Sequence, residues 1–349
     1  MISFASDYLA GAHPEVLRRL VETNLEPLPG YGSDSYSERA REKIRAASSA
    51  PEAGVEFLTG GTQANAVVLA ALLGDGEGVL AAESGHIAVH EAGAVEYSGH
   101  KVLTLPQREG KIVSEALSAW LAAFYADPNC EHMVRPGALY LSHPTEYGTL
   151  YSLAELTQIA SVCRRYGVRL YLDGARLGYA LACPASDVAL SDLARLCDAF
   201  TIGGTKVGAL CGEAVVFRRE AMPPHFLGAV KRRGALLAKG RLLGVQFDAL
   251  FTDGLYFRIG RYAAQMTEKL RAILTRCGLR LYLDSPTNQQ FVVLPDAALA
   301  QLREQVDVSV WEKPDAAHTV VRFAVSWSTT EEELETLERV LREIPGIRS

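Results

Sequence analysis

Short apolar strands alternate with helices between residues 55 and 217, and this alternation constrains the fold more than any other feature of the chain. The strand candidates are the apolar runs at 55–59, 78–82, 101–105, 138–142, 169–173, 199–203 and 213–217. Helical periodicity fills the intervals between them, as at 62–73 and 152–167. Parallel strands need crossover connections of this kind, and strands that are covered on both faces are apolar throughout. We therefore predict an α/β fold with a mostly parallel seven-stranded sheet between helices.

The pattern changes after Arg218. Helical periodicity broken by glycines runs from 225 to 278. Strand candidates then follow at 279–284, 288–295, 308–313 and 319–327, with helix candidates at 298–306 and 329–344. This predicts a small α+β domain that is joined to the first domain by a long helix.

We expect three parts in the chain: an N-terminal arm at 1–20 that packs with the small domain, a large domain at 21–245, and the small domain at 246–349. Pro14 predicts the start of the first helix, because proline suits the first helical position. Ser35 and Glu38 have the spacing of a capping box, which predicts a second helix start there.

The charge balance argues against nucleic acid or membrane partners. The chain has 35 lysines and arginines and 41 aspartates and glutamates, giving a net charge of −6 with no long block of one sign. No apolar run reaches transmembrane length, and the residues after Met1 lack the basic and apolar regions of a signal peptide. The six cysteines are scattered, without a disulfide framework or zinc spacing. We therefore expect a cytoplasmic protein without a metal site.

A glycine-rich turn follows the first predicted strand, where Thr59-Gly60-Gly61-Thr62 leads directly into a helix. Free N–H groups at a helix start, with the helix dipole behind them, bind phosphate well. Gly61 would permit close approach, and Thr62 would add a hydroxyl donor. The same residues also suit a plain turn with a helix cap, so this element alone leaves both interpretations open.

Asp173 ends the predicted strand at 169–173 and Arg176 lies three residues after it, at the edge where ligands of open parallel sheets bind. A carboxylate that emerges from an apolar strand is costly unless it is paired. One interpretation is an internal salt bridge between the two residues. The functional interpretation lets Asp173 hold a cationic ring nitrogen while Arg176 faces an anionic substrate.

Lys206 lies between an apolar strand and a further apolar stretch, among glycines and small residues. Most lysines are solvated, and a loop lysine is the simplest interpretation. The apolar neighbours favour a desolvated Lys206 instead, whose lowered pKa would make its amine a nucleophile toward carbonyls.

His86 and His90 are four residues apart and share a helix face. As zinc ligands they would need a third partner, and Glu91 is misplaced for an H-E-x-x-H motif, which argues against a metal. We expect the ring of His86 to stack on a planar cofactor and His90 to be a core or supporting residue.

The ordered set of these motifs resembles the fold-type I pyridoxal-phosphate enzymes. In closer detail, the chain is similar to the low-specificity L-threonine aldolases of the β-eliminating lyase family over nearly its whole length. The resemblance is carried by S-D near the N-terminus, Y-G-S-D in the early loop, G-G-T-x-x-N, G-H-I-x-x-x-E-x-G-A, D-G-A-R, the lysine strand and a late arginine.

This resemblance implies that the cofactor is pyridoxal 5'-phosphate. Lys206 would hold it through a Schiff base, Asp173 would pair with its pyridinium nitrogen, and His86 would stack on its ring. The remaining cofactor-binding residues would be Gly61 and Thr62 at the phosphate, with Thr205 and Arg176.

The resemblance also implies how the substrate is bound. Ser6, Arg176 and Arg322 would grip the carboxylate of a small amino acid, for which arginine geometry is well suited. Tyr31, counted among the substrate-binding residues, and Lys231-Arg232 would reach the site of a neighbouring subunit. A homotetramer, as a dimer of dimers with active sites at the subunit interface, is therefore implied.

Two departures from the commoner family pattern are visible. Residues 143–146 read His-Pro-Thr-Glu where many relatives have Glu-Asn-Thr-His, so Glu146 stands in place of the family's hydroxyl-contacting histidine. Gly203-Gly204-Thr205 precedes the lysine and Val207 follows it, where relatives often show Ser-Lys-Gly.

The implied reaction is retro-aldol cleavage of L-threonine or L-allo-threonine to glycine and an aldehyde. Candidates for the base that deprotonates the β-hydroxyl are His86, His90 and Glu146, and we favour His86, directly or through water. Two alternatives stay open: β-elimination or transamination on the same scaffold, and a catalytically silent cofactor-binding protein with a regulatory role.

Overall fold

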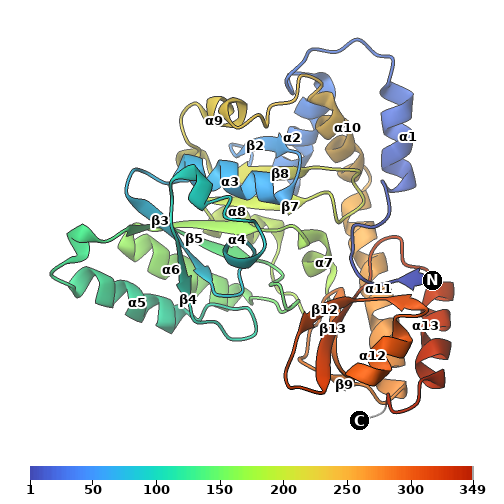
Figure 1. Ribbon diagram of the computed structural model, residues 1–349. Helices are drawn as coiled ribbons and strands as arrows, with labels where there is room; N and C mark the ends of the chain where they lie inside the picture. The colour runs from blue at the N-terminus through green and yellow to red at the C-terminus, as the bar shows by residue number, and fades with distance from the viewer. Residues whose placement is uncertain (348–349) are drawn as a thin grey trace.

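The computed structural model describes residues 1–347, and its large domain is built on one seven-stranded sheet (Figure 1). The strand order is β2-β8-β7-β6-β5-β3-β4. The strands are β2 (Gly54–Leu58), β3 (Glu77–Ala82), β4 (Val102–Leu105), β5 (Arg135–Ser142), β6 (Arg169–Asp173), β7 (Ala199–Gly203) and β8 (Glu213–Phe217). Only β8 runs against its neighbours β2 and β7, and the other pairs are parallel. The mostly parallel seven-stranded sheet predicted from the sequence is confirmed.

Helices cover both faces of this sheet and bury its apolar side chains. On one face lie α3 (Gly61–Leu72), α4 (His86–Val89) and α9 (Phe226–Arg232). The core of the other face includes side chains from α1 (Pro14–Thr23), α2 (Ser35–Ala47), α5 (Ser114–Ala126), α6 (Leu153–Tyr166), α7 (Leu177–Ala182), α8 (Leu190–Leu196) and α10 (Arg241–Leu250). Short 3₁₀ turns lie at Glu96–Ser98, Cys130–His132 and Arg219–Ala221.

Local capping chemistry sets where several helices begin. α1 starts at Pro14, as predicted. α2 starts at Ser35, but Asp34 caps it by accepting a hydrogen bond from the backbone N–H of Ser37 at 2.9 Å. The predicted capping box of Ser35 and Glu38 is therefore wrong, because the preceding carboxylate takes the cap position and satisfies the free N–H.

A long helix, α11 (Leu255–Arg276), leads into the small domain, as predicted. This domain has an antiparallel sheet in the order β12-β13-β10-β9. Its elements are β9 (Arg280–Leu281), β10 (Gln289–Pro295), α12 (Asp296–Leu302), β11 (Val306–Asp307), β12 (Ser309–Glu312), β13 (His318–Ala324) and α13 (Glu331–Glu343). The predicted strand at 279–284 is shorter than expected, and α13 begins with a capping box of Thr330 and Glu333.

The first residues of the chain belong to the edge of the small domain (Figure 1). β1 (Ile2–Ser3) pairs in parallel with β11, and the backbone N–H of Ala324 donates to the carbonyl of Phe4 at 2.8 Å. α1 instead packs against α10. The domain boundaries at residues 20 and 245 stay predictions.

Gly203, the last residue of β7, packs tightly against the loop that follows β6. A Cβ at this position would lie 2.2 Å from the carbonyl oxygen of Ala175 and 2.7 Å from that of Gly174. Both atoms are backbone and cannot rotate away. We expect Gly203→Ala to lower the free energy of unfolding by about 1–3 kcal/mol, as in other overpacked positions.

Chemical denaturation of the purified variants measures this effect. Gly11→Ala is the matched control, because a Cβ at Gly11 would meet nothing within 4 Å and should cause no loss of stability. Equal stability of Gly203→Ala and the wild type would contradict the close packing at the end of β7.

Among residues 1–347, no helix combines the length and the apolar character needed to cross a membrane. The six cysteines are free thiols.

Candidate active site

Two adjoining hollows open at the carboxyl ends of the central strands. The inner hollow, of about 340 Å³, is lined by the large domain and by Tyr8. The outer hollow, of about 410 Å³, extends to the small domain. The two share Tyr8, His86, Glu146, Arg176 and Lys206. Both have the size typical of sites for small molecules.

These hollows bring together most of the residues that the sequence singled out. The inner hollow is lined by Gly61, Thr62, His86, Glu146, Asp173, Arg176, Thr205 and Lys206. The outer hollow adds His90 and Arg322. Their roles toward a ligand stay predictions.

The turn before α3 has the features of an anion site. Gly60 is the N-cap of α3, and no side chain caps the helix. A Cβ at Gly60 or Gly61 would meet nothing within 4 Å, so the turn faces open space. The Gln63 side chain holds the preceding strand end by accepting hydrogen bonds from the backbone N–H and hydroxyl of Thr59 at 3.1 and 2.6 Å. Exposed helix N–H groups at such a turn suit a phosphate.

Asp173 is buried at the end of β6 and is held by neutral donors. Its Oδ2 accepts hydrogen bonds from the Asn65 amide at 2.9 Å and the Tyr140 hydroxyl at 2.8 Å. Its Oδ1 accepts from the backbone N–H of Ala175 at 2.9 Å. The internal salt bridge with Arg176 is not formed, because Arg176 pairs with Asp7. Asp173 therefore presents a fixed carboxylate to the inner hollow, where it can meet a cationic N–H.

Lys206 reaches the inner hollow from the turn after β7. Within residues 1–347, the ion pairs of lysine side chains involve Lys43, Lys111, Lys269 and Lys313, not Lys206. Burial lowers the pKa of Lys206, and the nearby Arg176 guanidinium lowers it further. The neutral amine is thereby favoured, which is the form that attacks a carbonyl carbon.

His86 is oriented by a buried carboxylate. Its Nδ1 lies 2.7 Å from Oε1 of Glu91, and the Asn65 amide donates to the same oxygen at 2.7 Å. With the Nδ1 proton directed at Glu91, Nε2 is left to accept a proton in the hollow. The ring of His90 lies 5.6 Å from that of His86 and 6.5 Å from that of Trp311, so His90 supports the ring cluster from the outer hollow.

Glu146 faces both hollows. Its Oε1 accepts hydrogen bonds from the backbone N–H of His86 at 2.8 Å and from the Ser142 hydroxyl at 2.6 Å. Burial raises the pKa of the Glu146 carboxyl. The group therefore keeps its proton to a higher pH than an exposed glutamate does.

Arg176 is held in a two-point ion pair. Its Nε and Nη2 donate to Asp7 at 2.6 and 3.0 Å, and the Asn288 amide donates to the same carboxylate at 2.9 Å. Burial alone would raise the pKa of Asp7, but the cations of Arg176 and Lys206 outweigh it and hold the value at about 2. Asp7 therefore stays ionised and fixes the direction in which Arg176 faces the hollows.

Arg322, which lines the outer hollow, and Ser6, which lines neither hollow, both keep unused polar atoms. Arg322 donates from Nη1 to the Gln289 side chain and from Nη2 to the carbonyl of Ala5, both at 2.9 Å. Its Nε and the hydroxyl of Ser6 are buried without a partner among the described residues. Buried donors without partners are costly, and an anionic ligand would supply acceptors.

Tyr31 lies outside both hollows and is 49% exposed. The ammonium group of Lys231 lies 4.6 Å from the centre of its ring. The contact of these residues with a neighbouring subunit stays a prediction.

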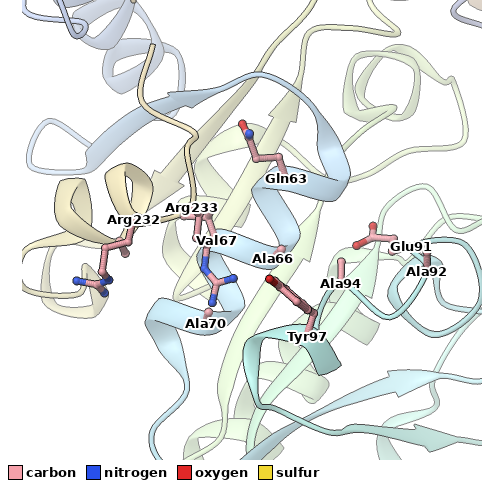
Figure 2. Close-up of a pocket in the computed structure, with 11 residues that line it drawn as sticks. Gln63, Ala66, Val67, Ala70, Glu91, Ala92, Ala94, Tyr97, Arg232 and Arg233 are labelled. Carbon is pink, nitrogen blue, oxygen red and sulfur yellow. The ribbon is translucent and has the colours of Figure 1, made fainter. Parts of the chain in front are cut away.

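A separate cavity of about 700 Å³ lies between α3, α9 and the segment after α4 (Figure 2). Figure 2 shows the Arg233 side chain crossing from α9 toward Tyr97, while Arg232 points away from α3. Glu91, which is hydrogen-bonded to His86, also lines this cavity, whereas Lys206 and Asp173 do not.

Several supporting residues had no role assigned from the sequence. Asn65 and Asp7 stand within quoted motifs, but only the fold shows that each holds a charged neighbour. Tyr140 could have been found from strand register, because Tyr140 and Tyr171 are paired and Asp173 faces the same side as Tyr171. Glu213 also lines the inner hollow, and its only sequence signal is an acidic residue at the start of an apolar strand.

Comparison with known proteins agrees with this arrangement. A model of the β-eliminating lyase family matches residues 3–324. A low specificity L-threonine aldolase of Pseudomonas aeruginosa is 29% identical over 351 residues, which cover 98% of each chain. The solved structure of a threonine aldolase from Leishmania major is 39% identical, with a TM-score of 0.94 over 98% of this chain and 99% of that one. An aspartate aminotransferase of Thermus thermophilus, 17% identical with a TM-score of 0.71 over 98% of this chain and 91% of that one, shares the fold.

Proposed function

Because the chain belongs to the β-eliminating lyase family and is a pyridoxal-phosphate-dependent lyase, we propose that it cleaves β-hydroxy-α-amino acids to glycine and an aldehyde. Threonine and allo-threonine are the proposed substrates. The meeting of Lys206, Asp173 and His86 around one hollow, beside the uncapped start of α3, carries this proposal. The threonine aldolases among its relatives support the substrate class.

The inner hollow has groups that fit each part of pyridoxal phosphate. The N–H groups of Gly61 and Thr62, with the Thr205 hydroxyl, would bind the phosphate, and the Lys206 amine would take the aldehyde carbon. Asp173 would keep a proton on the ring nitrogen, since its carboxylate is fixed at the end of β6. When bound, the cofactor accepts the electron pair released at Cα as a bond to that carbon breaks.

The substrate carboxylate would bind between Arg322 and Arg176. The unused Nε of Arg322 and the Ser6 hydroxyl supply donors, while Asp7 keeps the Arg176 guanidinium in place. Fixing the carboxylate at this position orients the bonds at Cα relative to the hollow. The arginines therefore determine which bond is placed for cleavage.

His86 is the proposed base for the β-hydroxyl proton. The Nδ1–H of His86 would donate a hydrogen bond to Glu91, so Nε2 would take a proton from the substrate directly or through water. The Glu91 carboxylate would stabilise the positive charge that then develops on the imidazole ring. Glu146 is held beside the backbone of His86 and would hydrogen-bond to the hydroxyl. We also propose a homotetramer in which Tyr31 and Lys231 approach a neighbouring subunit's hollow.

Product analysis tests this function. Purified protein loaded with pyridoxal phosphate is expected to convert L-allo-threonine and L-threonine to glycine and acetaldehyde in equal amounts. Aldehyde is followed by its enzymatic reduction, and glycine by amino acid analysis. A four-carbon 2-oxo acid with ammonia would instead indicate β-elimination, and a 2-oxo acid without free ammonia would indicate transamination. No turnover on a panel of β-hydroxy amino acids would favour a silent cofactor-binding protein.

A further inference from the structure

Glu213 lies in the wall of the inner hollow and has no part in the reaction proposed above. It is the first residue of β8 and stands opposite Leu58 of β2 and Gly203 of β7. β2 leads directly into the turn before α3, and β7 leads into Lys206. Glu213 is therefore placed between the strand that delivers the anion-binding turn and the strand that delivers the lysine.

The Glu213 carboxyl group is buried without a cation at ion-pair distance. The residue is 4% exposed, its Oε2 accepts a long hydrogen bond from the backbone N–H of Gly204 at 3.3 Å, and the Thr205 hydroxyl is the other donor beside it. An ionised carboxylate with so few donors is costly in a buried position. Burial raises the pKa of Glu213 to about 8, although Lys206 acts in the opposite direction. Burial therefore favours the protonated carboxyl group, which can donate a hydrogen bond.

The charged and titratable groups around Glu213 come from each neighbouring element. They are Lys206 after β7, Asp173 and Tyr171 on β6, Tyr256 on α11, and Glu56, which lies two residues before Leu58 on β2 and is paired with Arg41. Burial also raises the pKa of both tyrosines, and burial lowers that of Lys206. Around neutral pH the tyrosines are uncharged, so the phosphate of a ligand would be the strongest new charge beside Glu213.

We propose that Glu213 binds the phosphate group of the cofactor as a neutral carboxylic acid and thereby makes phosphate binding depend on pH. The O–H of Glu213 donates to a phosphoryl oxygen, completing a site whose other donors are the N–H groups at the start of α3 and the Thr205 hydroxyl. Loss of this proton replaces a donor with a carboxylate that repels the phosphate dianion. The inference rests on the cofactor of the proposed function.

The test uses apoprotein and measures binding, not turnover. Dissociation constants for inorganic phosphate, pyridoxal phosphate and pyridoxal are measured between pH 6.5 and 9.5 by calorimetry. As the pH rises through the pKa of Glu213, the affinity of the wild type for inorganic phosphate and for pyridoxal phosphate is expected to fall. This fall in affinity should be about tenfold larger than the fall in Glu213→Gln. The glutamine amide still donates a hydrogen bond but does not ionise. Pyridoxal, which has no phosphate, should bind with the same pH dependence to both proteins.

Glu56→Gln is the matched control, because Glu56 lies on the neighbouring strand and does not line the hollow. It should behave as the wild type. If the affinity for phosphate changes with pH in the same way in the wild type and in Glu213→Gln, the proposal is overturned. It is also overturned if the substitution changes the pH dependence of pyridoxal binding as much as that of phosphate binding, because this would indicate an effect through Lys206.

If Glu213→Gln does not fold, infrared spectra of the wild type and of Glu146→Gln decide the question. A protonated-carboxyl band that shifts on phosphate binding in both the wild type and Glu146→Gln, and disappears above pH 9, supports the proposal, and no such band in Glu146→Gln overturns it. Since phosphate binding needs no turnover, absence of glycine and aldehyde in the product assay would reject the proposed function without rejecting this role of Glu213.

Discussion

Replacing Lys206 with alanine is expected to abolish turnover and the visible absorbance of the lysine-bound cofactor together. The variant loses the only amine proposed to take the cofactor's aldehyde. Turnover should therefore fall by at least about 10³-fold. Spectra of protein mixed with pyridoxal phosphate, followed by the glycine assay, measure both effects.

Folding should survive this change, because the Lys206 side chain is not part of an ion pair that its removal would leave broken. Lys101→Ala, at an exposed position, is the control and should retain wild-type absorbance and activity. An unchanged absorbance band in Lys206→Ala would refute the assignment of the lysine.

Asp173→Asn is expected to leave the cofactor bound but to lower kcat by about 10² to 10³-fold, the scale of losing one fixed charge at a reacting group. Asparagine keeps the shape of the side chain and an oxygen for the hydroxyl of Tyr140. It cannot hold a proton on the ring nitrogen, so the electron pair released at Cα would be stabilised less well.

Release of the cofactor with alkali measures how much of it the variant binds. Stopped-flow and steady-state assays measure the rate of the reaction, so that a loss of cofactor is distinguished from a lower kcat. Asp198→Asn is the matched control, because Asp198 accepts a hydrogen bond from the backbone of Leu170, as Asp173 does from Ala175, but lies outside the hollow. Activity of Asp173→Asn within about twofold of the wild type would rule out the proposed charge partner.

The large sheet was predictable because its strands carry their own signal. β6 and β7 are apolar runs that end at a charged residue or a glycine, and the helices between the strands have clear periodicity. The cap of α2 was not predictable to the residue, since Asp34 and Ser35 are both good caps and the choice depends on the loop before them.

For residues at or just after strand ends, such as Asp173 and Lys206, the position beside the inner hollow could be foreseen, while their roles stay predictions. Their partners were harder to foresee, because the contacts join distant segments. Asp7 meets Arg176 only after the chain start has folded against the small domain, and Glu91 becomes a partner of His86 only through the turn after α4. Spacing in sequence does not encode these distances.

The pairing of the chain's first residues with β11 and β13 has a consequence for biosynthesis. The carbonyl of Ala5 accepts from Arg322, and Asp7 binds Arg176 and Asn288, so segments that lie 317 and 281 residues apart in the chain must meet. Closing so long a loop is slow, so the contacts of residues 5–7 with the rest of the chain form late in folding. A chain that has not yet formed β13 would therefore have the lysine and the anion-binding turn without Arg322. A chain without residues 5–7 would keep both arginines but lose the Asp7 carboxylate that orients Arg176 and the Ala5 carbonyl that holds Arg322.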